Sequence, residues 1–217
     1  KAASLPWNNW LGKRLDGDVI NNLKDETGVT TSISVTTING WTSTTNMGHL
    51  TGNNSGVFPD AVLESGLLDS SAARQIKISG LNTSKQYNLV FAGSQNEGIS
   101  ANASYAAQEQ TVTLNAKYNT TRTANLNNLT PDANGEILVT VTRSGPVMYL
   151  NGIAIEEIDP SLQLLGPNNI YAEALERTKV KITWSDRTKN ETGYEVMRAT
   201  DSAFSKNVQK IQLAANT

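Results

Sequence analysis

Tryptophan and side-chain amides lie close together at two places in this chain, a combination suited to holding a sugar. Trp7 and Trp10 flank two asparagines near the start, and Trp41 follows Asn39-Gly40. A sugar ring has an apolar face that packs on indole, while neighbouring amides hydrogen-bond its hydroxyls. The alternative is that these large side chains close over a hydrophobic core. We therefore expect three candidate ligand contacts, Trp7, Trp10 and Trp41.

Residues 46–60 form a second candidate region, because they lack apolar periodicity and contain three glycines among polar side chains. A long ordered loop on a rigid scaffold is a common place for a binding site. The alternative is that its polar groups bond backbone that no strand satisfies. A catalytic pair of Ser55 as nucleophile and His49 as base is not indicated, because Ser55 does not lie in a strand–turn–helix motif. The candidate ligand residues in this loop are His49, Asn53, Asn54 and Asp60.

Carboxylates near the start and near the end of residues 1–160 supply the hard oxygen ligands that Ca²⁺ prefers. Sandwich modules of the jelly-roll kind often carry structural calcium near their first loops and last strand. The spacing matches no EF-hand loop, and solvated carboxylates or helix caps are the alternative. No cofactor is required, but a structural Ca²⁺ is a candidate, with Asp16, Asp18, Asp25, Glu26 and Glu157 as its possible ligands.

Composition excludes several classes of chemistry. The chain has no cysteine and one histidine, which removes thiolate nucleophiles, Cys-ligated metals and two-histidine motifs. A net charge of −2 with 18% charged residues gives no basic patch for nucleic acid. No apolar run approaches the roughly 20 residues that insertion into a membrane requires. The acidic residues are scattered and single out no acid–base pair, so we expect a protein that is not an enzyme.

The elements that must position these residues are strands. Apolar and polar residues alternate over short segments separated by turn residues, the pattern of half-buried strands. A short helix is expected at 19–23, with Asp18 as its N-cap. The fold class is all-β, an antiparallel β-sandwich, with strands expected at 32–38, 74–79, 87–92, 110–114, 121–126, 136–142 and 148–157.

A change in amino-acid composition near residue 160 indicates a domain boundary. A leucine-rich linker at 162–165 leads into Gly166-Pro167, and strands are expected at 179–184 and 193–198, with a polar loop at 186–192. The pattern Val-x-Ile-x-Trp, then Glu-Thr-Gly-Tyr-Glu-Val-x-Arg, resembles the B and C strands of a fibronectin type III module, with Trp184 as its core tryptophan. Because a full module has about 90 residues, residues 161–217 are expected to be a linker plus its N-terminal half.

Residues 1–160 resemble a secreted β-sandwich module of Bacteroidetes. The matching motifs include Pro6-Trp7-Asn8-Asn9-Trp10, Gly56-Val57-Phe58-Pro59-Asp60 and Tyr149-Leu150-Asn151-Gly152-Ile153. The resemblance implies a galactose-binding-like jelly roll, a module that usually stands before fibronectin type III repeats. It supports carbohydrate binding by analogy of fold, and fold does not fix function.

These features lead to one functional hypothesis and two alternatives. A surface rich in Asn, Thr, Ser and Gly is typical of extracellular β-proteins, so we expect a secreted or cell-surface location. The first hypothesis is a non-catalytic recognition or adhesion module whose partner is a polysaccharide or surface glycan. The alternatives are a structural spacer of a large adhesin or fibre, and an ancillary region of a polysaccharide-degrading enzyme. Neighbouring domains or chains are expected to complete the half module.

Overall fold

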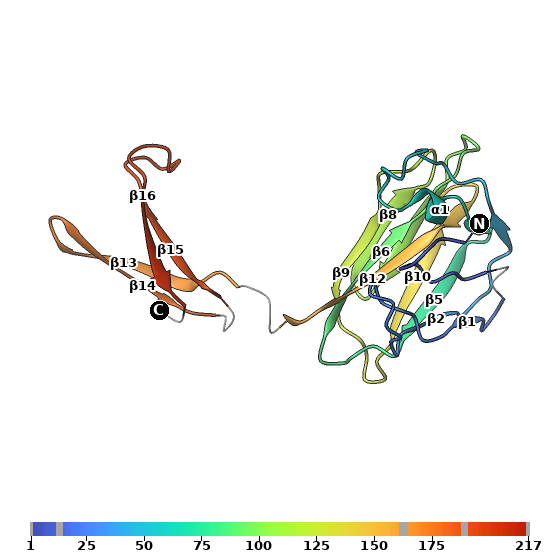
Figure 1. The fold of residues 1–217 in the computed structure, drawn as a ribbon, viewed down its shortest axis with the longest axis horizontal. Coiled ribbons are helices and arrows are strands. Elements are labelled where there is room, and N and C mark those ends of the chain that lie inside the picture. The colour runs from blue at the N-terminus through green and yellow to red at the C-terminus, as the bar shows by residue number, and fades with distance from the viewer. Residues whose placement is uncertain (1, 12–14, 161–164, 188–190, 216–217) are drawn as a thin grey trace. The chain divides into compact units, whose positions relative to one another are not determined.

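The computed structural model describes residues 2–11, 15–160, 165–187 and 191–215. The chain divides into two compact units, Lys1–Ile158 and Asp159–Thr217, which we call unit 1 and unit 2 (Figure 1). Residues 161–164 of the expected linker, and residues 188–190 of the expected loop, lie outside the described residues. No helix in the described ranges is long and apolar enough to cross a membrane.

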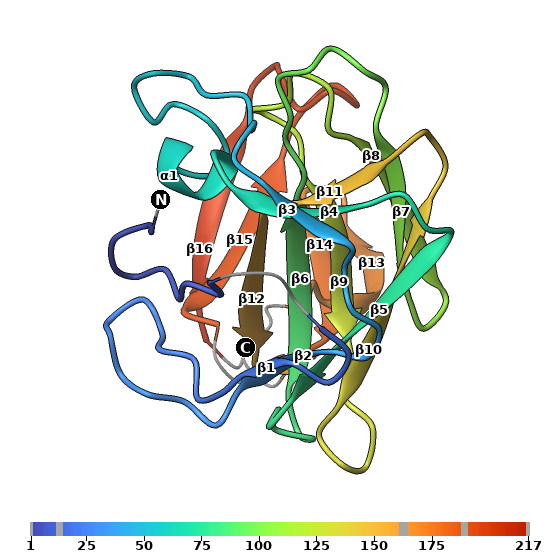
Figure 2. The same cartoon turned by 90° about the vertical axis from the view of Figure 1, so that its right-hand side faces the viewer.

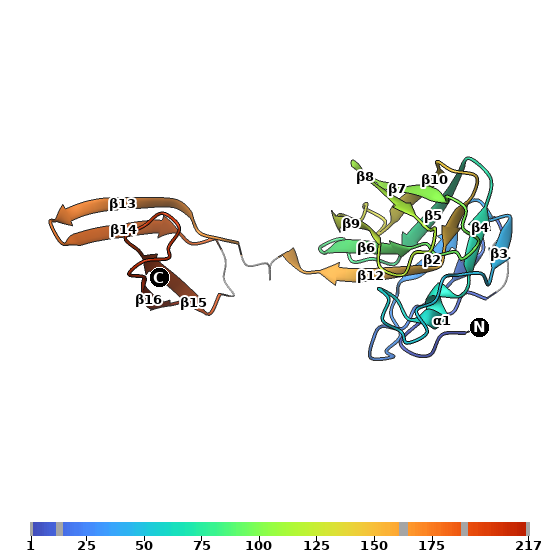
Figure 3. The same ribbon diagram turned by 90° about the horizontal axis from the view of Figure 1, so that it is seen from above.

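Unit 1 is an all-β structure whose named strands all pair antiparallel, as the sequence predicts. Strands β12, β6 and β9 face a six-stranded sheet (Figure 3), and a short sheet of β11, β4 and β3 lies beside them. The six-stranded sheet has the order β1 (Val19–Ile20), β2 (Ser34–Thr37), β5 (Ala73–Ser79), β10 (Ile137–Arg143), β7 (Asn102–Ala107) and β8 (Gln110–Asn115). The others are β12 (Gly152–Ile158), β6 (Gln86–Ala92), β9 (Ala124–Leu129), β11 (Met148–Leu150), β4 (Gly66–Asp69) and β3 (Ser43–Thr45).

Alternation along the central strands builds the core between the sheets. On β10 the inward residues Ile137, Val139 and Val141 are buried, while Leu138 between them is 48% exposed. On β6 the odd-numbered residues do the same, and Phe91 stacks on Tyr105 of β7 with ring centroids 4.7 Å apart. Period-2 burial of this kind is the signature from which these strands were predicted.

The outer face of β6 and β12 is also covered. The short helix α1 (Asp60–Leu63) buries Val62 and Leu63, and these residues cluster with Phe58 and Ala92. Trp7 packs against the same cluster, and Figure 2 shows the N-terminal segment and α1 on the same side of unit 1. The segment that carries Ala3 and Trp7 is therefore part of the fold of unit 1.

One expected strand, 148–157, is two strands in the structure. Met148–Leu150 pairs with β4 and Gly152–Ile158 pairs with β6, so the chain changes sheets at Asn151. The Asn151 side chain accepts a hydrogen bond from the Ser94 N–H (2.8 Å) and donates one to the Leu63 carbonyl (2.7 Å). The apolar run continues through the break, so periodicity alone does not reveal it.

The expected helix at 19–23 is wrong. Val19 and Ile20 form β1 and pair with Thr36 and Val35, because β-branched residues favour a strand when a partner edge is available. Asp18 does not cap a helix; its carboxylate accepts a hydrogen bond from the Leu15 N–H at 2.9 Å.

Other strands were shifted or missed. The strand expected at 121–126 is found at Ala124–Leu129, and besides β1 the unpredicted strands of unit 1 are β3, β4 and β7. Strand β7 has the sequence NASYAA, in which two of the three inward residues are alanine and give a weak apolar signal. Burial of these alanines against neighbouring strands is a tertiary effect that the local sequence does not show.

Unit 2 consists of two hairpins. Strand β13 (Asn168–Glu176) pairs with β14 (Lys179–Ser185), and β15 (Gly193–Arg198) pairs with β16 (Gln209–Ala214). Strands β14 and β15 confirm the expected 179–184 and 193–198, whereas β13 and β16 were not predicted. Trp184 contacts Tyr194 with ring centroids 5.3 Å apart.

A buried carboxylate at the end of β4 holds together the loops beside it. Asp69 is fully buried and accepts bonds from the Thr42 N–H (2.9 Å), the Ser71 N–H (2.5 Å) and Arg74 Nε (2.7 Å). Burial acts to raise the pKa of Asp69, but the hydrogen bonds from Ser71, Thr42 and Arg74 outweigh it and the pKa is lowered below its usual value.

This lowered pKa has a predictable effect on stability. A carboxyl whose pKa is lower in the folded state stabilises the fold above its unfolded pKa, and that contribution is lost as pH falls through the folded value. We expect Asp69→Asn to lower the free energy of unfolding by about 2 kcal/mol at pH 7, because Arg74 loses its ionic partner. The difference from wild type should shrink as pH falls below about 4.

Urea unfolding followed by circular dichroism at a series of pH values measures this difference. Glu109→Gln, an exposed site, is the control and should change little at any pH. A variant as stable as wild type at pH 7 would show that the carboxylate contributes nothing.

Candidate functional site

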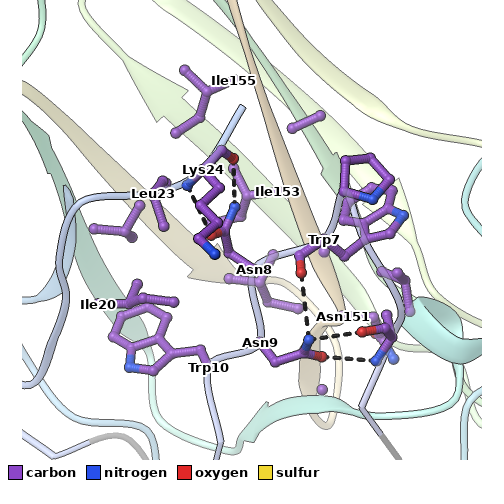
Figure 4. Close-up of a pocket in the computed structure, with 18 of the residues that line it drawn as sticks. Trp7, Asn8, Asn9, Trp10, Ile20, Leu23, Lys24, Asn151, Ile153 and Ile155 are labelled. Atoms are coloured by element: carbon purple, nitrogen blue, oxygen red, sulfur yellow. Dashed lines mark hydrogen bonds between the residues drawn. The ribbon is translucent and has the colours of Figure 1, made fainter. Parts of the chain in front are cut away.

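A groove of about 1280 Å³ runs along strand β12 on unit 1 (Figure 4). One wall is the N-terminal segment from Pro6 to Leu11, and the other walls come from the turn at 23–26, from α1 and from the end of β3. Two of the predicted ligand residues, Trp7 and Trp10, lie in this lining. The groove is therefore where the structure brings sequence-predicted residues together.

The groove exists because β12 is an edge strand. Among the described strands β12 pairs only with β6, so its other edge faces the groove. The inward side chains Ile153 and Ile155 pack against the main core yet stay half-buried. Ile20 and Leu23 contact the same core from the opposite side of the groove. The floor is consequently apolar.

Two asparagine amides fix the N-terminal segment at this open side. Asn8 Nδ2 donates to the Lys24 carbonyl (2.8 Å), and Asn8 Oδ1 accepts from the Lys24 N–H (2.9 Å). Asn9 makes the same reciprocal pair with the backbone of Ala3, both bonds being 2.8 Å long. The Asn8 amide thus joins the segment to the turn at 23–26, whereas the Asn9 amide closes the segment on itself. An amide has two N–H groups and two acceptor lone pairs on its oxygen. Asn8 therefore retains capacity both to donate and to accept, whereas Asn9 Nδ2 also donates to the Trp7 carbonyl (3.4 Å), so only the Asn9 oxygen retains capacity for a ligand.

The two indoles are anchored but not fully covered. Trp7 meets Phe58 edge-on, with ring centroids 5.1 Å apart and an interplanar angle of 63°. Trp10 packs against the main core cluster. Both side chains are half-buried, which leaves part of each ring facing the groove. Rigid, partly exposed indoles flanked by amides match the chemistry expected for sugar binding.

Four acidic residues are part of the groove lining. Asp25, Glu26, Glu156 and Glu157 all contribute to its lining. Glu157 accepts a hydrogen bond from the Tyr87 hydroxyl (2.9 Å), and Glu156 accepts one from Asn88 Nδ2 (2.7 Å). Glu156 and Glu157 are therefore charged acceptors whose positions are fixed by hydrogen bonds to β6.

Trp41 is buried, contrary to the expectation that it contacts a ligand. Its side chain is 1% exposed and belongs to the main core cluster, so it presents no ring face to a ligand. The loop before it is fixed by the Asn39 side chain, which accepts from the Gln75 N–H (2.7 Å), and by Asp16, which accepts from the Gly40 N–H (2.5 Å). The turn residues indicated a loop correctly, but the tryptophan turns inward from it.

The polar residues of the 46–60 loop mostly bond the loop itself. Asp60 accepts from the N–H and hydroxyl of Thr51 and from the Gly52 N–H, and the Thr51 N–H bond is the main reason that the pKa of Asp60 is lowered. Asn54 accepts from the Asp60 N–H, and Asn53 from the Ser55 N–H. In the described part of the chain, these residues satisfy backbone and do not line the groove.

His49 lies with a different set of residues. Its Nδ1 is 2.9 Å from Asn96 Oδ1, and its ring meets Tyr118 edge-on with centroids 5.3 Å apart. Neither Asn96 nor Tyr118 was a candidate from the sequence, because the loops that carry them are far from residue 49 along the chain.

The carboxylates proposed for calcium do not form a cluster. Within the described ranges, no three His, Asp or Glu side chains lie together in a way that could hold a metal ion. Asp25 instead closes a turn by accepting from Thr27 and Val29, and the Thr27 hydroxyl is the main cause of its lowered pKa. Asp16, Asp18 and Glu157 are engaged with Gly40, Leu15 and Tyr87, as described above. The set is thus dispersed over separate hydrogen bonds.

Comparisons with known proteins are limited. No family model matches the chain, and no curated protein matches it. Among solved structures the chain is similar to TmCBM61 in complex with β-1,4-galactotriose, with 15% sequence identity and a TM-score of 0.30, over 63% of this chain and 98% of that chain. A likeness at this level carries no argument about function. The resemblances to a Bacteroidetes module and to fibronectin type III remain predictions.

The clamp between Asn8 and Lys24 can be tested directly. We expect Asn8→Ala to free the segment that bears the two tryptophans, because both bonds to the Lys24 backbone are lost. The Lys24 amide should then exchange its hydrogen about tenfold faster, the equivalent of about 1.4 kcal/mol. Hydrogen exchange followed by NMR measures this rate.

Asn21→Ala, at an exposed site near the same groove wall, is the matched control and should leave the Lys24 amide unchanged. Equal exchange rates in wild type and Asn8→Ala would contradict a clamping role for this amide.

Proposed function

We propose that unit 1 is a non-catalytic recognition module that binds a saccharide in the groove beside β12. The observation that carries the proposal is the joint placement of Trp7 and Trp10 in one groove together with side-chain amides. The two rings stack on the sugar, and Asn8 and Asn9 hydrogen-bond its hydroxyls. The half-buried isoleucines of β12 meet the apolar faces of the rings.

The size of the groove favours a chain of sugars over a single ring. Pockets for small molecules usually measure about 300 to 1,000 Å³, and this groove has about 1280 Å³. A polysaccharide or surface glycan occupies such a length through several rings. This supports a module of a larger secreted or cell-surface protein, with adhesion, or attachment of an enzyme to its polysaccharide, as the role.

The groove chemistry favours binding without cleavage. Glu156 and Glu157 each accept a hydrogen bond across to β6, and the one histidine lies with Asn96 and Tyr118 rather than in the groove lining. A glycosidase requires one carboxyl to act as acid and another as base or nucleophile. We infer that these carboxylates orient hydroxyls instead.

Replacement of the tryptophans tests the proposal. We expect Trp7→Ala and Trp10→Ala each to weaken saccharide binding about thirtyfold, which corresponds to the loss of about 2 kcal/mol from a buried aromatic contact. Affinity electrophoresis of the full chain in gels containing galactan, xylan, β-glucan, mannan or pectin measures the binding, and thermal unfolding confirms that each variant folds.

Tyr171→Ala is the matched control, since Tyr171 is an aromatic side chain 64% exposed on unit 2. Its retardation should equal that of wild type. The proposal fails if no polysaccharide retards the protein, if the tryptophan variants bind as wild type does, or if the protein shortens the polysaccharide.

A second function, as a structural spacer or repeat unit, is favoured by the surface of unit 2. Large apolar side chains of both hairpins face solvent in the described residues: Ile170 is 66% exposed, Val180 63% and Ile211 59%. Exposed apolar surface of this extent usually marks an interaction site. We propose that unit 2 is half of a fibronectin type III sandwich and that strands from a neighbouring domain or chain cover it.

Unit 2 should therefore behave as an uncovered apolar surface when the 217-residue chain is studied alone. We expect it to enhance the fluorescence of the dye ANS, and Val180→Asp to reduce this enhancement at least about twofold, since a charge disrupts an apolar patch. Leu138→Asp, at an exposed apolar site on unit 1, is the control. Absence of dye binding would contradict the proposal.

A further inference from the structure

A second cluster on unit 1 combines an exposed aromatic ring with polar side chains and shares no residue with the groove lining. It consists of His49, Asn96, Lys117 and Tyr118. Three loops meet there, joined by bonds from the Asn96 N–H to the Met47 carbonyl (2.7 Å) and from the Val57 N–H to the Thr120 carbonyl (2.8 Å). The most exposed aromatic ring of these loops belongs to Tyr118, which is 50% exposed.

Tyr118 has an unusual backbone conformation. Its φ is +48°, in the left-handed region that costs a bulky residue roughly 1–2 kcal/mol. Its N–H donates to the Gln95 carbonyl (2.9 Å), which helps to hold this conformation. Strained residues of this kind persist where the surrounding structure over-determines them, often at functional sites.

The ring of Tyr118 is held as well as its backbone. The edge of His49 packs against it, and Lys117 Nζ lies 5.7 Å from its centroid. At Gly98 a Cβ would come within 2.6 Å of the Tyr118 hydroxyl oxygen, so the absence of a side chain there makes room for the phenol. A fixed ring loses little entropy when a ligand stacks on it.

Polar groups surround this ring. Asn96 Oδ1 can only accept, so His49 Nδ1 carries the hydrogen in their 2.9 Å contact, and Nε2 is the second polar atom of the imidazole ring. The Asn96 amide nitrogen and Lys117 Nζ are donors. A half-exposed aromatic face bordered by both acceptors and donors matches a sugar ring, with its apolar face and its hydroxyls.

The base under these loops is rigid. Asn119, 2% exposed, donates to the carbonyls of Gly93 and Arg122 at 2.9 Å each and accepts from the Arg122 N–H at 2.9 Å. One buried amide therefore fixes the residue next to Tyr118. The loop that carries Tyr118 is therefore preorganised by bonds within the protein.

We propose that Tyr118, with His49, Asn96 and Lys117, forms a second saccharide-contact surface, separate from the groove. The sugar stacks on the phenol ring, and the three polar side chains bond its hydroxyls. Two separate surfaces on one module allow a single polysaccharide, or two neighbouring chains, to be held at two points, which raises the apparent affinity without further contacts.

The test compares two replacements of one residue. Tyr118→Gly removes the ring and leaves a residue that adopts φ +48° without strain, so the fold is kept. We expect this variant of the full chain to bind at least about fivefold more weakly than wild type to the retarding polysaccharide among galactan, xylan, β-glucan, mannan and pectin. Tyr118→Phe, which keeps the ring, should bind within about twofold of wild type. Thermal unfolding of both variants checks their stability.

Each outcome decides the proposal. Wild-type binding by Tyr118→Gly overturns it and leaves the groove as the saccharide site. Equal loss in Tyr118→Gly and Tyr118→Phe also overturns the stacking role. Loss in Tyr118→Gly together with wild-type binding by Trp7→Ala and Trp10→Ala supports this surface and overturns the groove. Retardation by none of the polysaccharides overturns both proposals.

Discussion

The amide of Asn151 fixes the point on which the rest of unit 1 depends. It bonds the Ser94 N–H on one side and the Leu63 carbonyl on the other, at the point where the chain leaves one sheet and enters another. The next residue, Gly152, lies so close to α1 that a Cβ would approach Val62 to 2.8 Å. This change of sheets places β12 at the edge of the second sheet, and the open edge of β12 is the reason that a groove exists.

The N-terminal segment forms one wall of the groove beside this open edge. The amide of Asn8 attaches it to the backbone of Lys24 through a reciprocal pair of bonds, and the amide of Asn9 closes the segment on itself through the backbone of Ala3. Side-chain bonds of this kind fix the segment at the groove while leaving two half-buried indoles along it. Trp7 and Trp10 pack on the core clusters, and all four residues from Trp7 to Trp10 line the groove, so the segment both covers the core and forms a wall of the groove.

The fold was predictable where the alternation of apolar and polar residues alone identifies a strand. Alternation identified β5, β6 and β10, since their inward residues are large and apolar. It failed at Asn151, where the apolar run continues through a change of sheets, and at Val19–Ile20, where pairing with β2 decides between strand and helix. For the candidate site, the structure places Trp7 and Trp10, which the sequence singled out, in the lining of one groove. Trp41 was misjudged because a turn sequence does not say to which side the following ring points.

The most direct test of the groove is to locate a bound saccharide by NMR. Amide and indole N–H signals of the full chain would be followed during titration with β-1,4-linked galacto-, xylo- and gluco-oligosaccharides. The account predicts saturable shifts of the Trp7 and Trp10 indole signals and of the Ile153 and Ile155 amides. Saturable binding that leaves all four of these signals unmoved, or no shift with any of the oligosaccharides, would contradict it.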